Sequence, residues 1–341
     1  MSLTVNTQQA HELLIDCLRA KLVPMITGSP GCGKSALIHK IADEFNLELI
    51  DMRLSQCDPT DLLGFPSIDK KVGKASYVPM NTFPLDTDSK PVGKDGWLLF
   101  LDEFNSAPLS VQAAAYKLVL DRKVGQFELN KNVVIACAGN KDTDNAIVNR
   151  MSTAMQSRLI HLELEVDFKN WLDWASEADI DYRVRAYINF KPDNLYAFRP
   201  DHNDKTFACS RTWEFISKLI KGWDSIAPTK LPLLAGTISE GVAREFSSFC
   251  QIFKDLPTVA DIARDPTGIR MPDEPSTLYA ISGSVGNHCT ESNIDKLMQF
   301  VERMPIEFQI ITLRDVVKRK KDLIQNASVR GWIAKNSQEL F

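Results

Sequence analysis

The 341-residue sequence has few of the features that mark secreted, membrane or metal-binding proteins. Its seven cysteines are scattered without a Cys-x-x-Cys pair, a pattern typical of reduced thiols in a cytosol-like compartment. The five histidines show no zinc-ligand spacing, so we expect no metal held by side chains alone. No apolar run approaches the roughly 18 residues that span a bilayer, and the polar N-terminus carries no targeting signal. We therefore expect a cytoplasmic protein with no membrane segment.

The chain also lacks a large excess of charge of either sign. Its 40 basic and 44 acidic residues leave a net charge of −4, and 44% of its residues are hydrophobic. This balance excludes a disordered tail protein, a collagen-like repeat and a polybasic protein that binds nucleic acid mainly by bulk charge. At about 150 residues per domain, the length predicts two domains.

The first half of the chain alternates short apolar runs with amphipathic helical patterns, which is the rhythm of βαβ units. We expect strands at 24–27, 47–52, 97–101, 133–138 and 160–166, and helices at 34–45 and 109–120. The runs at 97–101 and 133–138 are apolar on both faces, which favours central parallel strands. The run at 160–166 alternates apolar and polar residues, so we expect it at an edge of the sheet.

Helical patterns dominate the second half. Apolar stripes at helical spacing predict core-facing helices. They comprise Leu234, Ile238, Val242, Phe246, Phe249 and Phe253; then Ile294, Leu297, Phe300 and Val301; then Leu313, Val316 and Val317. We therefore predict an α/β domain over residues 1–167 and a mostly helical region over residues 168–341.

A phosphate-binding loop is the strongest motif in the chain. Gly28-Ser29-Pro30-Gly31-Cys32-Gly33-Lys34-Ser35 matches GxxxxGK[ST] between an expected strand and an expected helix. Glycines let successive N–H groups point at phosphates, and the helix N-terminus adds its dipole. Lys34 is predicted to neutralise the β- and γ-phosphates, and Ser35 to bind Mg²⁺. Cys32 is either a redox-sensitive thiol at a helix N-terminus or a small residue that fills its position.

Polar residues follow two further expected strands. Asp102 and Glu103 end the run at 97–101, and Asn140 follows the run at 133–138. Ligands of open α/β sheets bind at the carboxyl ends of the strands. We predict that Asp102 holds Mg²⁺, that Glu103 orients or deprotonates the attacking water, and that Asn140 hydrogen-bonds the γ-phosphate and that water.

These pieces, in this order, resemble the AAA+ ATPases of the P-loop ASCE class, and within them the MoxR-like branch. The matching segments are GSPGCGKS (28–35), DLLGFP (61–66), LLFLDEFNSAP (98–108), ACAGNKDTD (136–144), MSTAMQSRL (151–159) and SRTWEF (210–215). The resemblance implies a three-layer αβα P-loop core with a parallel sheet, followed by a helical lid. It also implies ATP as the nucleotide and a ring-shaped homo-oligomer, usually a hexamer, with ATP bound between subunits.

Two arginines acquire roles from this resemblance. Arg158 matches the arginine finger that reaches the neighbouring subunit's γ-phosphate, with Arg150 as the nearest alternative. Arg211 matches the sensor 2 arginine of the lid. A guanidinium suits both roles because it binds phosphate oxygens in a bidentate manner. The chain departs from the family's common pattern at Leu159, where Phe is frequent, and at Ser210, where Pro is frequent.

The resemblance implies an ATP-hydrolysing ring motor that remodels or activates a protein, often with a partner that carries a von Willebrand factor A domain. One alternative is a nucleic-acid-associated AAA+ ATPase, which the net acidic charge disfavours. A second alternative is a scaffold whose assembly is gated by nucleotide, against which Glu103 and Arg158 argue.

Two further segments leave their roles open. Residues 62–96 form a long connection whose glycines and prolines suggest a hairpin-like insert. It either contacts a substrate or partner, or is a solvent-exposed loop covering the sheet edge. Lys318-Arg319-Lys320-Lys321 is either a contact for nucleic acid or a solvated helix face that complements a helix C-terminus.

Overall fold

The computed structural model describes residues 3–69, 73–144, 148–201 and 203–336. The chain divides into two compact units at Asp167, and the first unit also takes in Arg199–Asp201. We call them the α/β unit and the helical unit, and describe each by itself.

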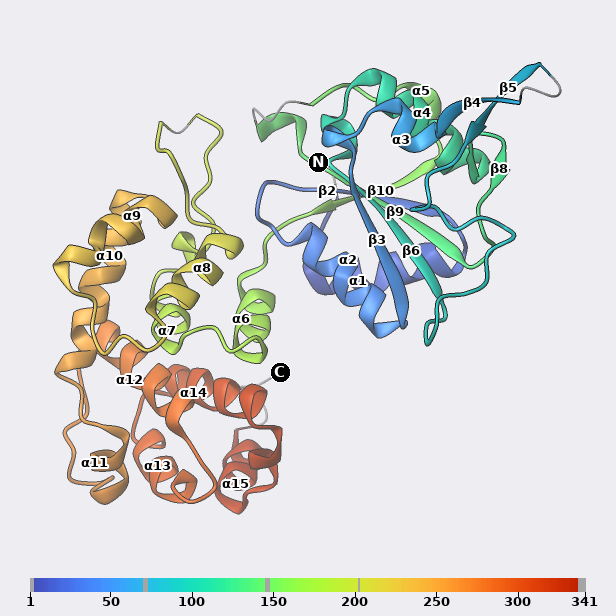
Figure 1. Cartoon of the computed structure of the whole chain (residues 1–341). Coiled ribbons are helices and arrows are strands. Elements are labelled where there is room, and N and C mark those ends of the chain that lie inside the picture. Colours follow the sequence, from blue (N-terminus) through green and yellow to red (C-terminus); the bar gives the residue numbers. More distant parts are fainter. Residues whose placement is uncertain (1–2, 70–72, 145–147, 202, 337–341) are drawn as a thin grey trace. The chain divides into compact units, whose positions relative to one another are not determined.

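A six-stranded parallel sheet forms the centre of the α/β unit (Figure 1). Its order is β1 (Thr4–Val5), β10 (Leu159–Leu164), β2 (Val23–Thr27), β9 (Val133–Gly139), β6 (Gly96–Asp102) and β3 (Leu47–Arg53). The five expected strands are therefore confirmed, but the edge position of 160–166 is wrong. Val5 pairs with Leu164, so β1 lies outside β10. A strand of two residues is too short to produce a readable alternation.

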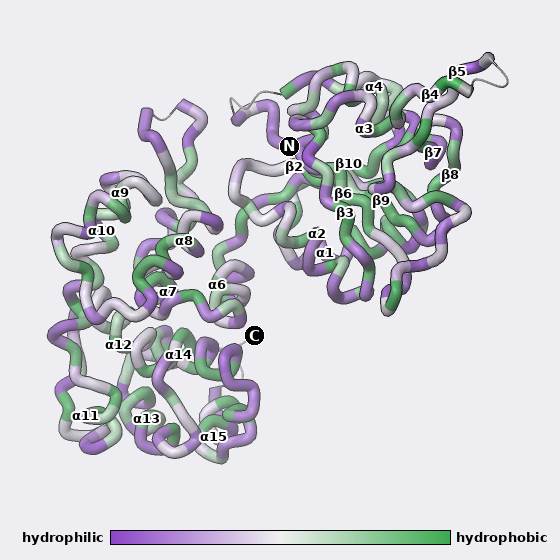
Figure 2. Tube along the Cα trace, viewed as in Figure 1, coloured by the Kyte–Doolittle hydropathy of each residue, from purple (hydrophilic) through white to green (hydrophobic). Residues whose placement is uncertain are grey.

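Helices cover both faces of this sheet. Alternate residues of β6 point to opposite sides: Leu98 and Phe100 pack with α1 (Thr7–Arg19) and α2 (Lys34–Glu44), whereas Leu99 and Leu101 pack with α3 (Pro59–Leu63) and α4 (Leu109–Asp121). The strands accordingly form the apolar centre of this unit (Figure 2). The short α5 (Thr153–Gln156) precedes β10. This is the three-layer αβα arrangement with a parallel sheet that the sequence predicts.

The expected hairpin in 62–96 is also confirmed. Strands β4 (Phe65–Asp69) and β5 (Lys74–Val78) pair antiparallel and project from the unit (Figure 1). Gly64 begins the hairpin with a φ of 92°, and a Cβ there would lie 2.2 Å from the Val78 carbonyl oxygen. Only glycine fits such a close approach. A second hairpin joins β7 (Lys123–Val124) to β8 (Phe127–Glu128).

The second unit is helical, as predicted. Its helices are α6 (Phe168–Glu177), α7 (Tyr182–Phe190), α8 (Ser210–Ile220), α9 (Leu231–Ile238), α10 (Glu240–Gln251), α11 (Val259–Arg264), α12 (Pro275–His288), α13 (Ile294–Val301), α14 (Ile306–Arg319) and α15 (Ala327–Lys335). The stripe at 294–301 is buried on α13. In the described part of the chain, no helix has the length and apolar character needed to cross a membrane.

The stripe from Leu234 to Phe253 does not belong to one helix, contrary to expectation. Ser239 adopts a φ of 75° and separates α9 from α10, and α10 ends at Gln251. Leu234, Ile238, Phe246 and Phe249 are nevertheless all buried. Helical spacing thus identified the core residues but not the break between the two helices, because a serine with a positive φ does not change the hydrophobic pattern.

Candidate functional site

The loop Gly28–Ser35 joins β2 to α2 at the carboxyl edge of the sheet. Gly31 and Gly33 adopt φ values of 76° and 97°, which side chains rarely tolerate. A Cβ at Gly28 would lie 2.8 Å from the Cys32 sulfur and 3.1 Å from the Leu164 carbonyl oxygen. The glycines therefore provide both the left-handed turns and the close packing that this loop requires. Ser29 and Pro30 complete the turn before α2 begins at Lys34.

Lys34 is the buried cation of the site, with a relative exposure of 9%. Its Nζ donates to the carbonyl oxygens of Gly28 (2.5 Å) and Ser29 (3.3 Å), and to Oδ1 of Asn140 (3.4 Å). All three acceptors are neutral oxygens. A buried ammonium solvated only by neutral groups favours an anionic ligand, because burying unpaired charge is costly.

Ser35 and Asp102 come together although 67 positions separate them in the sequence. Ser35 Oγ donates to Asp102 Oδ2 at 3.0 Å, and Asp102 Oδ1 accepts the backbone N–H of Glu103 at 2.8 Å. Both side chains are only partly buried. A hydroxyl beside a carboxylate is a set of hard oxygen donors that fits Mg²⁺ with waters and phosphate as its other ligands.

Glu103 turns sharply away from the end of β6. Its φ is 54°, which is unusual for a residue other than glycine and is a form of backbone strain often found at functional sites. Its carboxylate accepts a hydrogen bond from Ser55 Oγ, in the 3₁₀ turn that follows β3. Ser55 is not among the site residues predicted from the sequence. The available signal was that Ser55 is a polar residue beyond the strand next to β6 in the sheet.

Asn140 follows β9 and contacts Lys34, as described above. Its Nδ2 also lies 3.4 Å from Ser106 Oγ, and its backbone is hydrogen-bonded by the side chain of Asn105. The structure thus brings Lys34, Ser35, Asp102, Glu103 and Asn140 to one edge of the sheet. Asn105, which the sequence did not predict as a site residue either, lies two residues after Glu103.

The two arginines expected from the resemblance belong to other elements of the chain. Arg158 is exposed after α5; it donates to the Ala154 carbonyl oxygen at 2.8 Å, and its guanidinium carbon lies 5.6 Å from the centroid of the Tyr116 ring. The alternative, Arg150, is exposed before α5. Arg211 is exposed at the second position of α8, in the helical unit.

Cys32 is buried, with a relative exposure of 6%. Burial raises the pKa of its thiol, and the nearby Lys34 charge only partly offsets this effect. A protonated, buried thiol is a poor nucleophile. The structure therefore favours the packing role over the redox role.

Three of the four basic residues at 318–321 have partners within the helical unit. Lys318 pairs with Asp173 at 3.4 Å, Arg319 with Asp179 at 3.0 Å, and Lys320 donates to the Cys289 carbonyl oxygen at 2.5 Å. These residues end α14, so the helix C-terminal role is favoured over a contact with nucleic acid.

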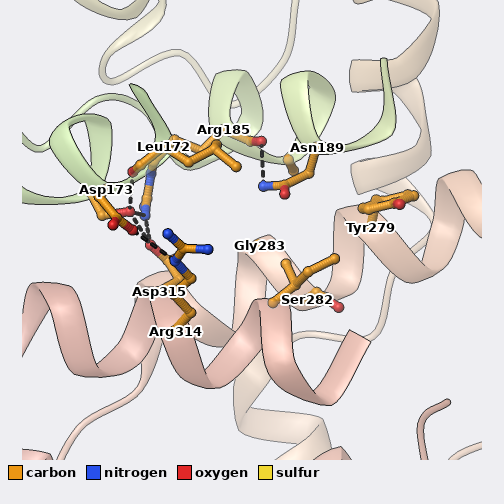
Figure 3. Close-up of a pocket in the computed structure, with 12 residues that line it drawn as sticks. Leu172, Asp173, Arg185, Asn189, Tyr279, Ser282, Gly283, Arg314 and Asp315 are labelled. Atoms are coloured by element: carbon orange, nitrogen blue, oxygen red, sulfur yellow. Dashed lines mark hydrogen bonds and ion pairs between the residues drawn. The ribbon is translucent and has the colours of Figure 1, made fainter. Parts of the chain in front are cut away.

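A pocket of the helical unit lies among α6, α7, α12 and α14 (Figure 3). Arg185 pairs with Asp315 beside it, and Arg314 pairs with Asp173.

No group of three or more His, Cys, Asp or Glu that could hold a metal occurs among the residues that the structure describes.

Residues 24–159 match the family model described as AAA domain (dynein-related subfamily). The matched segment contains the loop 28–35, Asp102, Glu103, Asn140 and Arg158. The α/β unit is thus similar to this family over the whole candidate site, which supports an AAA+ P-loop domain.

Solved structures similar to the chain include the RuvB Holliday junction branch migration motor of Thermotoga maritima. It is 15% identical, with 86% of each chain covered and a TM-score of 0.37. NtrX from Brucella abortus in complex with ADP is 13% identical, with 98% of this chain and 68% of that chain covered and a TM-score of 0.35. No curated protein matches the chain.

Proposed function

We propose that this protein is an AAA+ ATPase that binds ATP with Mg²⁺ at the loop Gly28–Ser35 and hydrolyses it to ADP and phosphate. The observation that carries the proposal is the convergence of Lys34, Ser35, Asp102 and Glu103 at one edge of the sheet. The family match over residues 24–159 supports it independently.

The loop supplies the binding energy for the phosphates. Its N–H groups and the N-terminus of α2 form a positive cradle, and the buried Lys34 ammonium exchanges neutral carbonyl partners for anionic phosphate oxygens. Ser35 and Asp102 would hold Mg²⁺. The metal, when bound, neutralises charge on the β- and γ-phosphates.

Hydrolysis needs a positioned water and a base. Water attacks the γ-phosphorus in line, the bond to the bridging β–γ oxygen breaks, and that oxygen leaves with ADP. Glu103 orients the water and accepts its proton, while Ser55 fixes the direction of the Glu103 carboxylate. Asn140 adds a neutral amide beside the γ-phosphate, which stabilises developing charge without adding repulsion.

We further propose that subunits assemble into a ring, as the MoxR-like resemblance implies, and act on a protein partner such as one with a von Willebrand factor A domain. Arg158 is exposed, and its guanidinium lies over the Tyr116 ring. This arrangement suits an arginine that binds the nucleotide of a neighbouring subunit. Arg211 is proposed as the sensor 2 residue of the lid.

ATP binding by calorimetry and phosphate release test the site. Lys34→Ala should lose ATP binding, and Glu103→Gln should bind ATP without hydrolysing it. Lys117→Ala is the control for loss of a lysine, because Lys117 also donates to a glycine carbonyl oxygen (Gly125, 2.5 Å) but is exposed and lies on α4, outside the loop. Retained ATP affinity in Lys34→Ala, or turnover near wild type in Glu103→Gln, would contradict the proposal.

A further inference from the structure

Asn105 is a buried polar residue that the proposed chemistry leaves without a role. It lies in the 3₁₀ turn Phe104–Ser106, directly after the Asp102-Glu103 pair, and its relative exposure is 3%. Its side-chain amide makes two hydrogen bonds with the backbone of Asn140. Oδ1 accepts the Asn140 N–H at 3.0 Å, and Nδ2 donates to the Asn140 carbonyl oxygen at 2.7 Å.

The end of β9 is shaped to admit this amide. A Cβ at Gly139 would lie 2.3 Å from Asn105 Oδ1 and 2.7 Å from Asn105 Cγ, so glycine at 139 leaves the space that the amide fills. The backbone of Asn105 is held as well, because its carbonyl oxygen accepts the Asn149 N–H at 2.6 Å. The Asn105 side chain is therefore held in place by its burial, by the two hydrogen bonds of its amide and by the space that Gly139 leaves for it.

The two hydrogen bonds fix the backbone on both sides of the Asn140 Cα. With its N–H and C=O held, Asn140 directs its side chain to Lys34, whose Nζ lies 3.4 Å from Oδ1. Asn105 also belongs to the segment that carries Glu103. Its amide thus sets the spacing between the residue that handles the water and the residue beside the γ-phosphate.

We propose that Asn105 is a positioning residue that holds Asn140 in register with Glu103 and Lys34 during ATP hydrolysis. This inference rests on the proposed function. The amide touches no nucleotide; it acts through Asn140. A displacement of about 1 Å at a catalytic group can cost roughly a hundredfold in rate. Nucleotide binding depends on the loop 28–35, so loss of Asn105 lowers kcat and leaves KM for ATP nearly unchanged.

The test compares Asn105→Ala with Asn130→Ala. Asn130 is a matched control: it has a relative exposure of 5%, and its Nδ2 donates to the carbonyl oxygens of Leu85 (3.2 Å) and Asp88 (2.8 Å), before β9 rather than after it. Asn105→Ala should lower kcat about 10- to 100-fold with KM within about threefold. Asn130→Ala should lower Tm to a similar extent and keep its kcat.

Gly139→Ala supplies a second route to the same defect. The added methyl group displaces the Asn105 amide while both asparagines remain, so kcat should fall as in Asn105→Ala. The double variant Asn105→Ala/Gly139→Ala should show no further loss, because the methyl group then meets only Met25 Cε, at 2.7 Å, which is the end of a flexible side chain and can move aside.

The outcomes separate the inference from the proposed function. A kcat for Asn105→Ala within twofold of wild type, or additive losses in the double variant, would overturn the positioning role while ATP hydrolysis stands. Absence of Lys34-dependent ATP turnover in the wild-type protein would overturn the proposed function and this inference together.

Discussion

Breaking the buried ion pair between Arg185 and Asp315 from one side should strongly destabilise the helical unit (Figure 3). The side chain of Arg185 is 3% exposed and that of Asp315 is 15% exposed. Asp315 also accepts from Ser176 Oγ at 2.9 Å, and Arg185 Nε donates to the Ile180 carbonyl oxygen at 2.9 Å. The network thus joins α6, α7 and α14.

Removing one partner leaves the other charge buried. Asp315→Ala leaves the buried Arg185 guanidinium without its carboxylate partner. Such a loss typically lowers the free energy of unfolding by about 3–5 kcal/mol. The pair Arg314–Asp173 is the matched control. It joins α14 to α6, two of the three helices in the network, at 2.7 Å, but its side chains are 40% and 27% exposed. Arg314→Ala should therefore cost no more than about 1 kcal/mol.

Urea unfolding followed by tryptophan fluorescence measures this difference, because five of the six tryptophans (Trp171, Trp174, Trp213, Trp223 and Trp332) belong to the helical unit. The double variant Arg185→Met/Asp315→Leu removes both charges and should recover much of the loss. A loss for Asp315→Ala no larger than that for Arg314→Ala would refute the reasoning that burial sets the cost.

Two further predictions concern the α/β unit. Arg158→Ala subunits, inactive alone, should regain part of their ATPase activity when mixed with Lys34→Ala subunits, since each supplies what the other lacks; Tyr116→Phe, which keeps the ring beneath Arg158, is the control. Mixed rings without activity at any ratio would argue against a finger acting in trans. Cys32 should resist iodoacetamide at pH 7.5, and its labelling should rise only at a pH above the ordinary thiol pKa, because burial raises the pKa of Cys32 and keeps its thiol protonated. Mass spectrometry should find the partly exposed Cys17 and Cys57 labelled before Cys32, and rapid labelling of Cys32 would contradict its burial.

The sequence predicted the features that depend only on residues close together in the chain. An apolar run predicts a buried strand wherever it stands, so β2, β3, β6 and β9 were predicted with ends within one residue of those observed. The phosphate-binding loop depends on glycine conformations and on a helix that starts at Lys34, and neighbours in the sequence specify both. The two-residue β1 and the break at Ser239 escaped detection because neither alters a hydrophobic pattern.

Tertiary structure alone decided which polar residues support Glu103 and Asn140 at the site. Ser55 reaches Glu103 because β3 pairs with β6, and Asn105 reaches Asn140 because β6 pairs with β9. No spacing in the chain encodes these pairs, since strand order follows from how the whole sheet buries its apolar faces. The sequence by itself determined the chemistry of the phosphate-binding loop and the acidic pair; the order of the strands decided what holds them in place.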